Sequence, residues 1–371
     1  MQFIQSTREA LLKPLQIVGG IVEGRQTLPM LSNILVNANG SEVTFTTTDL
    51  EIQIRTSAQI GVGTDPVTVT VPAAKLIALL TALPSASTEV SMLTEGKKVM
   101  LRANNSRFTL SQMAAEEYPV LPVAEIDYTF SLPANVLKHL MQMVHFAMAQ
   151  QDIRYYLNGM LLSIDKGLVR AVATDGHRLA CCDAPLEIET GVESPIEAIL
   201  PRKTVHQLMK LLPDTDDPVK LEVSKTQARF TFGNIEFLTK LVDGKYPDYN
   251  RVIPQNNDKI FLINREELIG ALKRAAILAN EKFKGLRWLV TPGSLHIQSA
   301  NSEMEEADEE IAINYEGEEL DLGFNVVYLL DALGNLKNTE VRFAFANNQG
   351  ATLLTMPESE QFRYVLMPMR I

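Results

Sequence analysis

The chain has 371 residues, which is too long for one ordinary hydrophobic core, so two or three domains are expected. With 46% hydrophobic and 21% charged residues, its composition excludes a disordered or fibrous protein. The formal net charge of −11 argues against a protein that holds nucleic acid by its overall charge, because neutralising phosphates requires clustered lysine and arginine.

The predicted elements repeat three times along the chain. Each third opens with a short strand that contains a phenylalanine, Phe3, Phe130 or Phe261, and that runs into a helical pattern. A second helical pattern follows in each third. The six patterns cover residues 8–22, 72–83, 134–149, 202–212, 265–283 and 325–337.

Segments between and after these helices alternate apolar and polar residues, which predicts half-buried antiparallel strands. Such segments lie at 42–54, 107–112, 221–241 and 340–356. Each third is therefore predicted to be an α+β module with the order β-α-β-β-β, twice.

Related connectors at 117–122 and 245–249 put the module boundaries near 126 and 257. The predicted modules are 1–126, 127–257 and 258–371. The alternative is that three unrelated α+β domains share a common order of strands and helices.

Positive charge is concentrated in the predicted helices. The six helical patterns together carry a net charge of +7, so the rest of the chain carries −18. If the helices line a cavity and the sheets face outward, a DNA duplex would meet a weakly positive wall inside a negative exterior. The alternative is that these are ordinary solvated helix faces.

The size of the modules then predicts an assembly. A compact module of about 125 residues is equivalent to a sphere roughly 35 Å across. Three such spheres in a ring leave a hole of about 5 Å and six leave one of about 35 Å, whereas duplex DNA needs roughly 20 Å. Three modules per chain therefore predict a head-to-tail homodimer, closed as a six-domain ring with helices lining the pore and sheets outside.

The remaining sequence features argue against a redox site or a metal site in this chain. Cys181 and Cys182 are adjacent, a spacing that fits neither a redox pair nor a zinc site, so buried reduced thiols are predicted. The acidic residues Asp214, Asp216 and Asp217 are typical of a solvated loop. We expect no metal and no cofactor. The polar start of the chain and the lack of a run of about 18 apolar residues predict a cytoplasmic protein without a membrane partner.

Several motifs together resemble one family. They are Leu-Pro at 28–29, Thr-Asp-Leu-Glu at 48–51, Gln-Asp-Ile-Arg-Tyr-Tyr-Leu-Asn-Gly-Met at 151–160, Ala-Thr-Asp-Gly-His-Arg-Leu at 173–179, the segments 240–249 and 275–278, and the C-terminal run 364–371. The chain resembles the bacterial sliding clamps, the beta subunits of DNA polymerase III, along its whole length. The resemblance implies a non-catalytic processivity factor, a homodimeric ring that encircles double-stranded DNA without sequence preference.

The resemblance also implies a hydrophobic pocket between the second and third modules that binds short peptides of other proteins. The partners implied are the clamp loader complex, the DNA polymerase III alpha subunit, other DNA polymerases, and mismatch-repair and other proteins. The matching residues are Leu157, Thr174, Gly176, His177, Arg178, Leu179, Pro247, Arg251, Val252, Val365, Leu366, Met367, Pro368, Met369 and Arg370. Aliphatic and methionine side chains suit a deformable apolar slot, and Arg178 and Arg251 are expected to hold polar groups at its rim. Without the resemblance, the C-terminal run would be interpreted as a last core strand. His177 beside Asp175 is interpreted as a pocket wall rather than a catalytic group.

Two further sets are implied. The DNA-binding candidates are Arg25, Gln151, Tyr155, Tyr156 and, on charge alone, Lys203. The dimer interface candidates are Lys75, Arg107, Phe108 and Leu110 of one copy facing Ile277, Leu278, Glu303, Glu305, Glu306, Asp308 and Glu309 of the other. Ala74 and Asn105 stand where relatives can carry basic residues, which puts a DNA contact and an ion pair there in doubt.

Two rival functions stay open. One is an enzyme that handles nucleotides, although the glycines at 19–20 and 61–63 lack the spacing of a phosphate-binding loop. The other is a monomeric peptide-binding protein with no role on DNA. Turnover of a nucleotide would favour the first, and a stable monomer the second.

Overall fold

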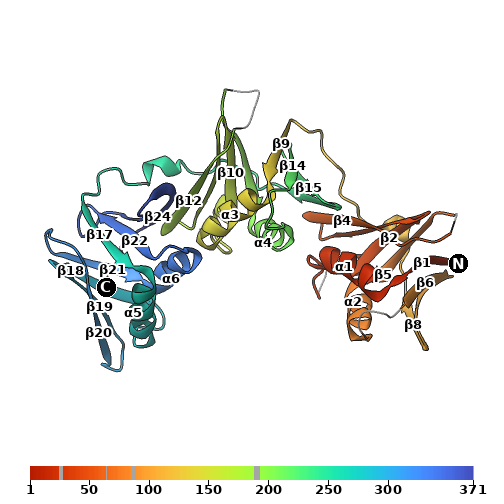
Figure 1. The fold of residues 1–371 in the computed structure, drawn as a ribbon, viewed down its shortest axis with the longest axis horizontal. Coiled ribbons are helices and arrows are strands. Elements are labelled where there is room, and N and C mark those ends of the chain that lie inside the picture. The colour runs from red at the N-terminus through yellow and green to blue at the C-terminus, as the bar shows by residue number, and fades with distance from the viewer. Residues whose placement is uncertain (25–27, 64, 85–88, 188–192, 371) are drawn as a thin grey trace. The chain divides into compact units, whose positions relative to one another are not determined.

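The computed structural model describes residues 1–24, 28–63, 65–84, 89–187 and 193–370. Within these residues the chain forms 24 strands and six α-helices (Figure 1). It divides into two compact units. Unit 1 comprises Met1–Asn135 and Gln207–Leu241, and unit 2 comprises Val136–His206 and Val242–Ile371.

The order β-α-β-β-β occurs six times in succession, as the sequence predicts for three α+β modules. The first two repeats are β1 (Gln2–Thr7), α1 (Arg8–Gly19), β2 (Asn33–Asn39), β3 (Glu42–Thr48), β4 (Ile52–Gln59), then β5 (Val67–Pro72), α2 (Ala73–Ala82), β6 (Glu89–Glu95), β7 (Lys98–Ala103) and β8 (Ser106–Ser111).

The next two repeats are β9 (Tyr128–Pro133), α3 (Ala134–Val144), β10 (Gly159–Asp165), β11 (Leu168–Thr174), β12 (Arg178–Pro185), then β13 (Ile196–Pro201), α4 (Arg202–Leu211), β14 (Pro218–Val223), β15 (Gln227–Phe232) and β16 (Ile235–Lys240). The last two are β17 (Lys259–Asn264), α5 (Arg265–Ile277), β18 (Gly285–Thr291), β19 (Ser294–Ala300), β20 (Glu306–Ala312), then β21 (Leu320–Asn325), α6 (Val326–Asn335), β22 (Glu340–Phe345), β23 (Thr352–Met356) and β24 (Ser359–Leu366).

Polar side chains start three of the helices at the residue that ends the preceding strand. The side chains of Thr7, Asn264 and Asn325 accept hydrogen bonds from backbone N–H groups in the first turns of α1, α5 and α6. Such caps satisfy amides that a helix leaves without a partner, so the strand passes directly into the helix.

Some predicted helices extend beyond the C-terminal ends of the observed helices. The prediction for 265–283 is wrong beyond Ile277, where α5 ends. The side chain of Asn280 accepts hydrogen bonds from the backbone N–H groups of Lys282 and Phe283, which turns the chain toward β18. Residues 145–147, predicted as the end of the α3 helix, form a 3-10 turn.

Each unit contains one four-stranded and one eight-stranded antiparallel sheet. Unit 1 has the orders β1-β6-β7-β8 and β5-β2-β3-β4-β16-β15-β14-β9. Unit 2 has the orders β20-β19-β18-β21 and β13-β10-β11-β12-β24-β23-β22-β17. In the eight-stranded sheets the last strand of one repeat pairs with the last strand of the third repeat after it, so β4 pairs with β16 and β12 with β24.

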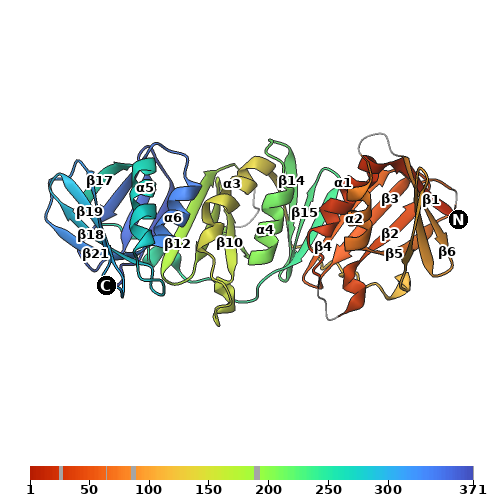
Figure 2. The ribbon, with the colours of Figure 1, turned by 90° about the horizontal axis from the view of Figure 1, so that it is seen from below.

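Helices pack against the sheets within each unit. In unit 1, α1 contacts α2 and lies against β3 and β4, and in unit 2, α5 contacts α6 and lies against β19 and β20. Figure 2 shows these helix pairs lying over the strands of their own unit. The cores of the units bury large apolar side chains, including Phe3, Phe45 and Trp288, and such burial is the dominant favourable term in folding.

Candidate functional site

A pocket of about 180 Å³ lies in unit 2, beside the junction of β12 and β24. Ten of the fifteen residues predicted for peptide binding line it, together with three others. The lining residues are Arg154, Tyr156, Leu157, Thr174, Gly176, His177, Arg178, Leu179, Pro247, Tyr249, Val252, Val365 and Met367. The structure thus brings together segments that are more than a hundred residues apart in the sequence.

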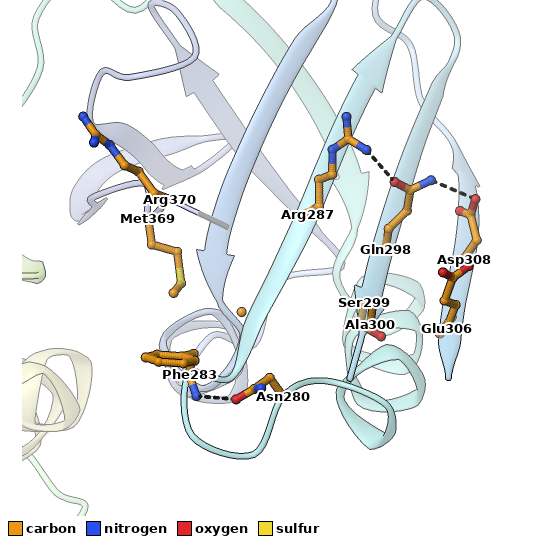
Figure 3. Close-up of a pocket in the computed structure, with 12 residues that line it drawn as sticks. Asn280, Phe283, Arg287, Gln298, Ser299, Ala300, Glu306, Asp308, Met369 and Arg370 are labelled. Carbon is orange, nitrogen blue, oxygen red and sulfur yellow. Dashed lines mark hydrogen bonds between the residues drawn. The ribbon is translucent and has the colours of Figure 1, made fainter. Parts of the chain in front are cut away.

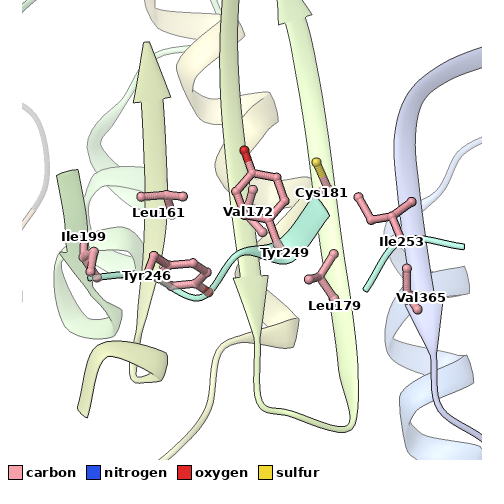
Figure 4. Close-up of a cluster of buried hydrophobic side chains, with 9 residues drawn as sticks. All are labelled: Leu161, Val172, Leu179, Cys181, Ile199, Tyr246, Tyr249, Ile253 and Val365. Atoms are coloured by element: carbon pink, nitrogen blue, oxygen red, sulfur yellow. The ribbon is translucent and has the colours of Figure 1, made fainter. Parts of the chain in front are cut away.

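A buried apolar cluster forms the base of this pocket (Figure 4). It consists of Leu161, Val172, Leu179, Cys181, Ile199, Tyr246, Tyr249, Ile253 and Val365. Leu179 and Val365 belong to both the cluster and the pocket and face each other across the β12–β24 pair. The pocket floor is therefore part of the folded core of unit 2, which preorganises it for an apolar ligand.

The turn between β11 and β12 forms one wall. One carboxylate oxygen of Asp175 accepts hydrogen bonds from the backbone N–H groups of His177 at 2.9 Å and Arg178 at 3.1 Å. The hydroxyl of Thr174 accepts from the N–H of Gly176 and donates to the carbonyl of Arg178. Gly176 has a φ of +90°, a conformation that L side chains rarely adopt. The wall is held rigidly by its own side chains.

Arg178, which was expected to hold polar groups at the rim, is largely buried and is held by groups of the fold itself. Its side chain is only 8% exposed, and it donates to Asp175 Oδ2 at 3.1 Å, Asp331 Oδ2 at 2.7 Å and the carbonyl of Phe146 at 2.6 Å. Its guanidinium also lies 4.3 Å from the ring centroid of Tyr328. Burial alone would lower the pKa of Arg178, but Tyr364, Asp331 and Asp175 raise it above its usual value, so the group stays charged.

The other predicted pocket residues lie elsewhere. Arg251 is 85% exposed, and its Nε lies 2.8 Å from Asp248 Oδ2. Leu366 is buried in β24. Met369 and Arg370 line two other clefts of unit 2, and Pro368 lines one of these two.

The chain end follows the four-stranded sheet of unit 2. The N–H of Met369 donates to the carbonyl of Gly323 in β21. In Figure 3, Met369 and Phe283 lie on the same side of a cleft that Arg287 and Gln298 line from the sheet. Met369 is thus anchored by its backbone to β21.

Three of the DNA-binding candidates lie in one ordered loop. Gln151 is exposed with a φ of +57°, and Tyr155 and Tyr156 form a 3-10 turn with their ring centroids 6.0 Å apart. Asp152 stabilises the loop by accepting two hydrogen bonds from the Arg154 guanidinium at 3.0 and 2.9 Å, which lower the pKa of Asp152 to about 2. Lys203 is in the first turn of α4, and the N–H of its neighbour Arg202 donates to the Asn158 carbonyl of this loop. Arg25 lies outside the described residues.

The sequence prediction did not assign Tyr156 and Arg154 to the pocket, although their motif pointed to it. Both line the pocket, although Tyr156 was predicted for DNA alone and Arg154 for neither ligand. They belong to the motif at 151–160 that also contains Leu157, so their neighbourhood could have been inferred from it. Tyr249 carries a similar signal, because it belongs to the segment at 240–249 that also contains Pro247, whereas Asp331 lies in none of the motifs.

Six of the eleven dimer interface candidates are on two edge strands, β8 and β20. Arg107, Phe108 and Leu110 are in β8, with Lys75 exposed on α2. On the other surface Ile277 is 77% exposed at the end of α5, next to Leu278. The acidic candidates are Glu303 and Glu305 in the turn before β20, and Glu306, Asp308 and Glu309 in β20. Within the described residues β8 pairs with β7 and β20 with β19, and neither has a second neighbour.

Hydrogen bonds at the ends of β8 and β20 show which backbone N–H groups of these strands point away from the neighbouring strand. The N–H of Gln112 donates to the Lys97 carbonyl beside β7, so by antiparallel alternation the N–H groups of residues 107, 109 and 111 face away from β7. The N–H of Asn301 donates to the Glu305 carbonyl and that of Ile313 to the Gly293 carbonyl, so the amides of residues 306, 308 and 310 face away from β19. Such rows of outward N–H and C=O groups are templates for another strand.

The charges of the two edges are opposite in sign. Arg107 and its neighbours Lys98 and Arg102 on β7 are basic, whereas β20 carries Glu306, Asp308, Glu309 and Glu310. Glu309 already accepts hydrogen bonds from Arg274 of its own chain, which lower the pKa of Glu309.

Both cysteines are free and buried, and burial raises the pKa of the Cys181 thiol to about 11. Among the residues described, no group of three or more histidine, cysteine, aspartate or glutamate side chains could hold a metal ion. None of the helices in the described part of the chain has the length and apolar character needed to span a bilayer.

Three family models match consecutive parts of the chain. They describe the N-terminal, central and C-terminal domains of the DNA polymerase III beta subunit and match residues 1–122, 131–248 and 250–370, respectively.

Full-length relatives agree with these models. The chain is 43% identical over 364 residues to the beta sliding clamp of Pseudomonas putida, covering 98% of both chains. It is 41% identical over 371 residues to the beta sliding clamp of Haemophilus influenzae, covering 100% of both. It is also similar to the solved structure of a sliding clamp from Pseudomonas aeruginosa bound to griselimycin, with a TM-score of 0.95, 42% identity and 100% coverage of both chains.

Proposed function

The chain belongs to the family of DNA polymerase III beta subunits, the beta sliding clamps, and from that premise we propose that two copies of it close into a ring around duplex DNA. It is a DNA sliding clamp. In the proposed assembly the three modules of each copy, with boundaries near 126 and 257, form half of a six-module ring.

The pairing of the strands carries this proposal. The last strand of the first repeat pairs with that of the fourth, and the last strand of the third repeat pairs with that of the sixth. Both pairings join an odd-numbered repeat to the third repeat after it, and within the described residues of one chain β8 of the second repeat does not pair with β20 of the fifth. For the fifth repeat the third repeat after it is an eighth, which is the second repeat of another copy. This pattern therefore pairs β20 of one copy with β8 of the next. Two copies joined in this way at both ends leave no free end, as a closed head-to-tail dimer requires.

Electrostatics and backbone geometry support the same joint. The outward amides of β8 and β20 can form a ladder of hydrogen bonds across the two copies. Basic Arg107 would face the acidic strand β20, which favours this pairing over β8 with β8 or β20 with β20. Phe108, Leu110, Ile277 and Leu278 would supply apolar contacts beside the ladder.

Enclosure explains how an acidic chain can stay on DNA. We infer that the helices line the pore, where exposed Lys13, Lys75 and Lys210 offer phosphates weak, sequence-independent contacts. Gln151, Tyr155 and Tyr156 are proposed to add contacts from their loop, with Lys203 at the start of α4. Weak contacts permit sliding, while the closed ring prevents escape.

The pocket beside β12 and β24 is proposed to tether partner proteins. Its apolar base and a volume of about 180 Å³ suit one or two large apolar side chains of a short peptide. The proposed partners are the DNA polymerase III alpha subunit, other polymerases, the clamp loader and repair proteins that carry such peptides. In this role the chain catalyses no reaction itself and works in the cytoplasm at the nucleoid.

Retention on circular and linear DNA tests the proposal. Clamps loaded onto a nicked circle are washed in high salt, and the same circle is then cut once. We expect retention on the closed circle and rapid loss after cutting, because enclosure survives salt but not a free DNA end. Equal loss from both forms would refute the ring.

A further inference from the structure

Asp331 lies in α6, behind the turn that forms one wall of the pocket, and does not line the pocket itself. Its Oδ2 accepts a hydrogen bond from Arg178 Nη1 at 2.7 Å. The Asp331 side chain is 35% exposed and that of Arg178 only 8% exposed. The ion pair therefore joins a helix of the sixth repeat to a strand of the third.

Helix α6 supports two neighbouring residues of the pocket wall. Besides the Arg178–Asp331 pair, the ring of His177 stacks on Tyr328 with centroids 6.4 Å apart. Tyr328 lies one turn before Asp331, so both contacts come from the same face of α6. Arg178 transmits this support onward, because it also donates to Asp175, the carboxylate that holds the N–H groups of His177 and Arg178.

We propose that Asp331 is a positioning residue for peptide binding: through Arg178 it fixes the 174–178 turn in the shape that receives the peptide. The inference rests on the proposed function of the pocket and adds a determinant that a ligand does not touch. Without the Asp331 carboxylate, a buried guanidinium loses a charged partner, and the turn can relax toward other arrangements.

The variant Asp331→Asn tests this role, because it keeps the shape of the side chain and removes its charge. The probe is fluorescein-labelled griselimycin, a cyclic peptide that is bound in the solved structure of the similar sliding clamp from Pseudomonas aeruginosa, and Kd is measured by anisotropy on the full chain. We expect Kd to rise on the order of tenfold. Asp331→Glu, which keeps the charge but displaces it, is expected to fall between Asp331→Asn and the wild type.

Glu222→Gln is the matched control. Glu222 of β14 accepts a hydrogen bond from the Arg229 Nε of β15 at 2.8 Å, and both residues belong to unit 1 and line no part of the peptide pocket. We expect its Kd to equal that of the wild type. Hydrogen exchange of the His177 and Arg178 amides provides a second readout, which Asp331→Asn should accelerate and Glu222→Gln should not.

The outcomes separate the inference from the function it rests on. A wild-type chain that does not bind the peptide overturns the proposed pocket and this inference together. Wild-type binding with an unchanged Kd in both Asp331 variants overturns only the positioning role. If Asp331→Asn fails to fold, Asp331→Glu and the exchange of the turn amides decide, and wild-type values in both contradict the proposal.

Discussion

The peptide pocket and the edge strands β8 and β20 differ in what a single copy of the chain provides. At the pocket, one copy supplies the walls, the buried base and the partners of the nearby charges, as Arg178 and Asp175 illustrate. At the edges, one copy supplies outward backbone groups and charges of one sign, and β8 and β20 each have one neighbouring strand within the described residues.

This difference follows from the repeat. The β12–β24 junction, where the pocket lies, is made inside the chain, whereas the equivalent junction of β20 requires a second copy. A junction inside the chain costs no translational entropy, so its surroundings can be rigid before any ligand arrives. The junction between copies can open, as a ring that must admit DNA requires.

Blocking one outward amide of β8 is expected to have the largest effect. Thr109 is exposed, and its N–H faces away from β7, so Thr109→Pro removes a donor for the neighbouring copy while leaving the β7 ladder in place. A lost bond and an unsatisfied carbonyl together cost about 1–3 kcal/mol at each of the two joints of the ring, so the dimer should weaken by at least about 30-fold. Light scattering over a dilution series measures this.

Thr109→Ala is the control for that variant, because it keeps the N–H and removes only the side chain. Its dimer should match the wild type within about twofold, and its retention on circular DNA should be unchanged. An equally strong dimer in Thr109→Pro would mean that β8 does not form the joint. Peptide affinity should be the same in both variants.

Gly176→Ala is expected to act on the pocket alone, with a smaller effect. The φ of +90° disfavours alanine, and its Cβ would lie 3.1 Å from Arg154 Nη2. A left-handed conformation costs an L residue roughly 1–2 kcal/mol, so peptide binding should weaken about tenfold as the turn shifts. Fluorescence anisotropy gives the affinity.

Gly293→Ala separates backbone strain from the pocket. Gly293 has a φ of +84°, and an added Cβ would meet no atom within 4 Å. Gly293→Ala should lower the free energy of unfolding about as much as Gly176→Ala does, because both place an L residue at positive φ, but it should leave the peptide affinity unchanged. Equal losses of affinity in both variants would show that general strain, and not the pocket wall, is responsible.

The smallest expected effect concerns the pH dependence of stability near the pocket. Burial lowers the pKa of His145, as do His206 and Arg202, while Asp331 and Asn335 oppose them. The fold therefore favours the neutral ring, and stability should fall as the pH drops below about 6.5, where the unfolded chain takes up the proton. Urea denaturation between pH 5 and 8 should show this loss reduced in His145→Gln. An identical pH profile in that variant would exclude His145 as the cause.

The sequence predicted the repeat better than the contacts between repeats. Periodic apolar residues are local signals, so the order of strands and helices was predicted correctly. The pairing of β4 with β16 and of β12 with β24 depends on edges more than a hundred residues apart, which periodicity does not encode.

At the pocket, too, local sequence motifs were predictive and contacts between distant segments were not. Residues of continuous motifs, such as Thr174 to Leu179, could be assigned to it, and the structure brings them together. Arg178 was assigned to the pocket through the resemblance and was expected to hold polar groups at its rim. Its burial depends on Asp331 and Phe146, which lie far away in the sequence, so no local pattern could predict it.

The central claim is that one copy forms the whole pocket, whereas the edge strands β8 and β20 need a second copy as their hydrogen-bond partner. Hydrogen exchange over a dilution series tests this claim most directly. We predict that the amides of residues 107, 109, 111, 306, 308 and 310 are protected in the dimer and lose protection as dilution releases single copies, while those of residues 176–178 keep theirs. If these edge amides exchange freely at concentrations where the mass is that of a dimer, the two copies are joined elsewhere, and the account of the ring is wrong.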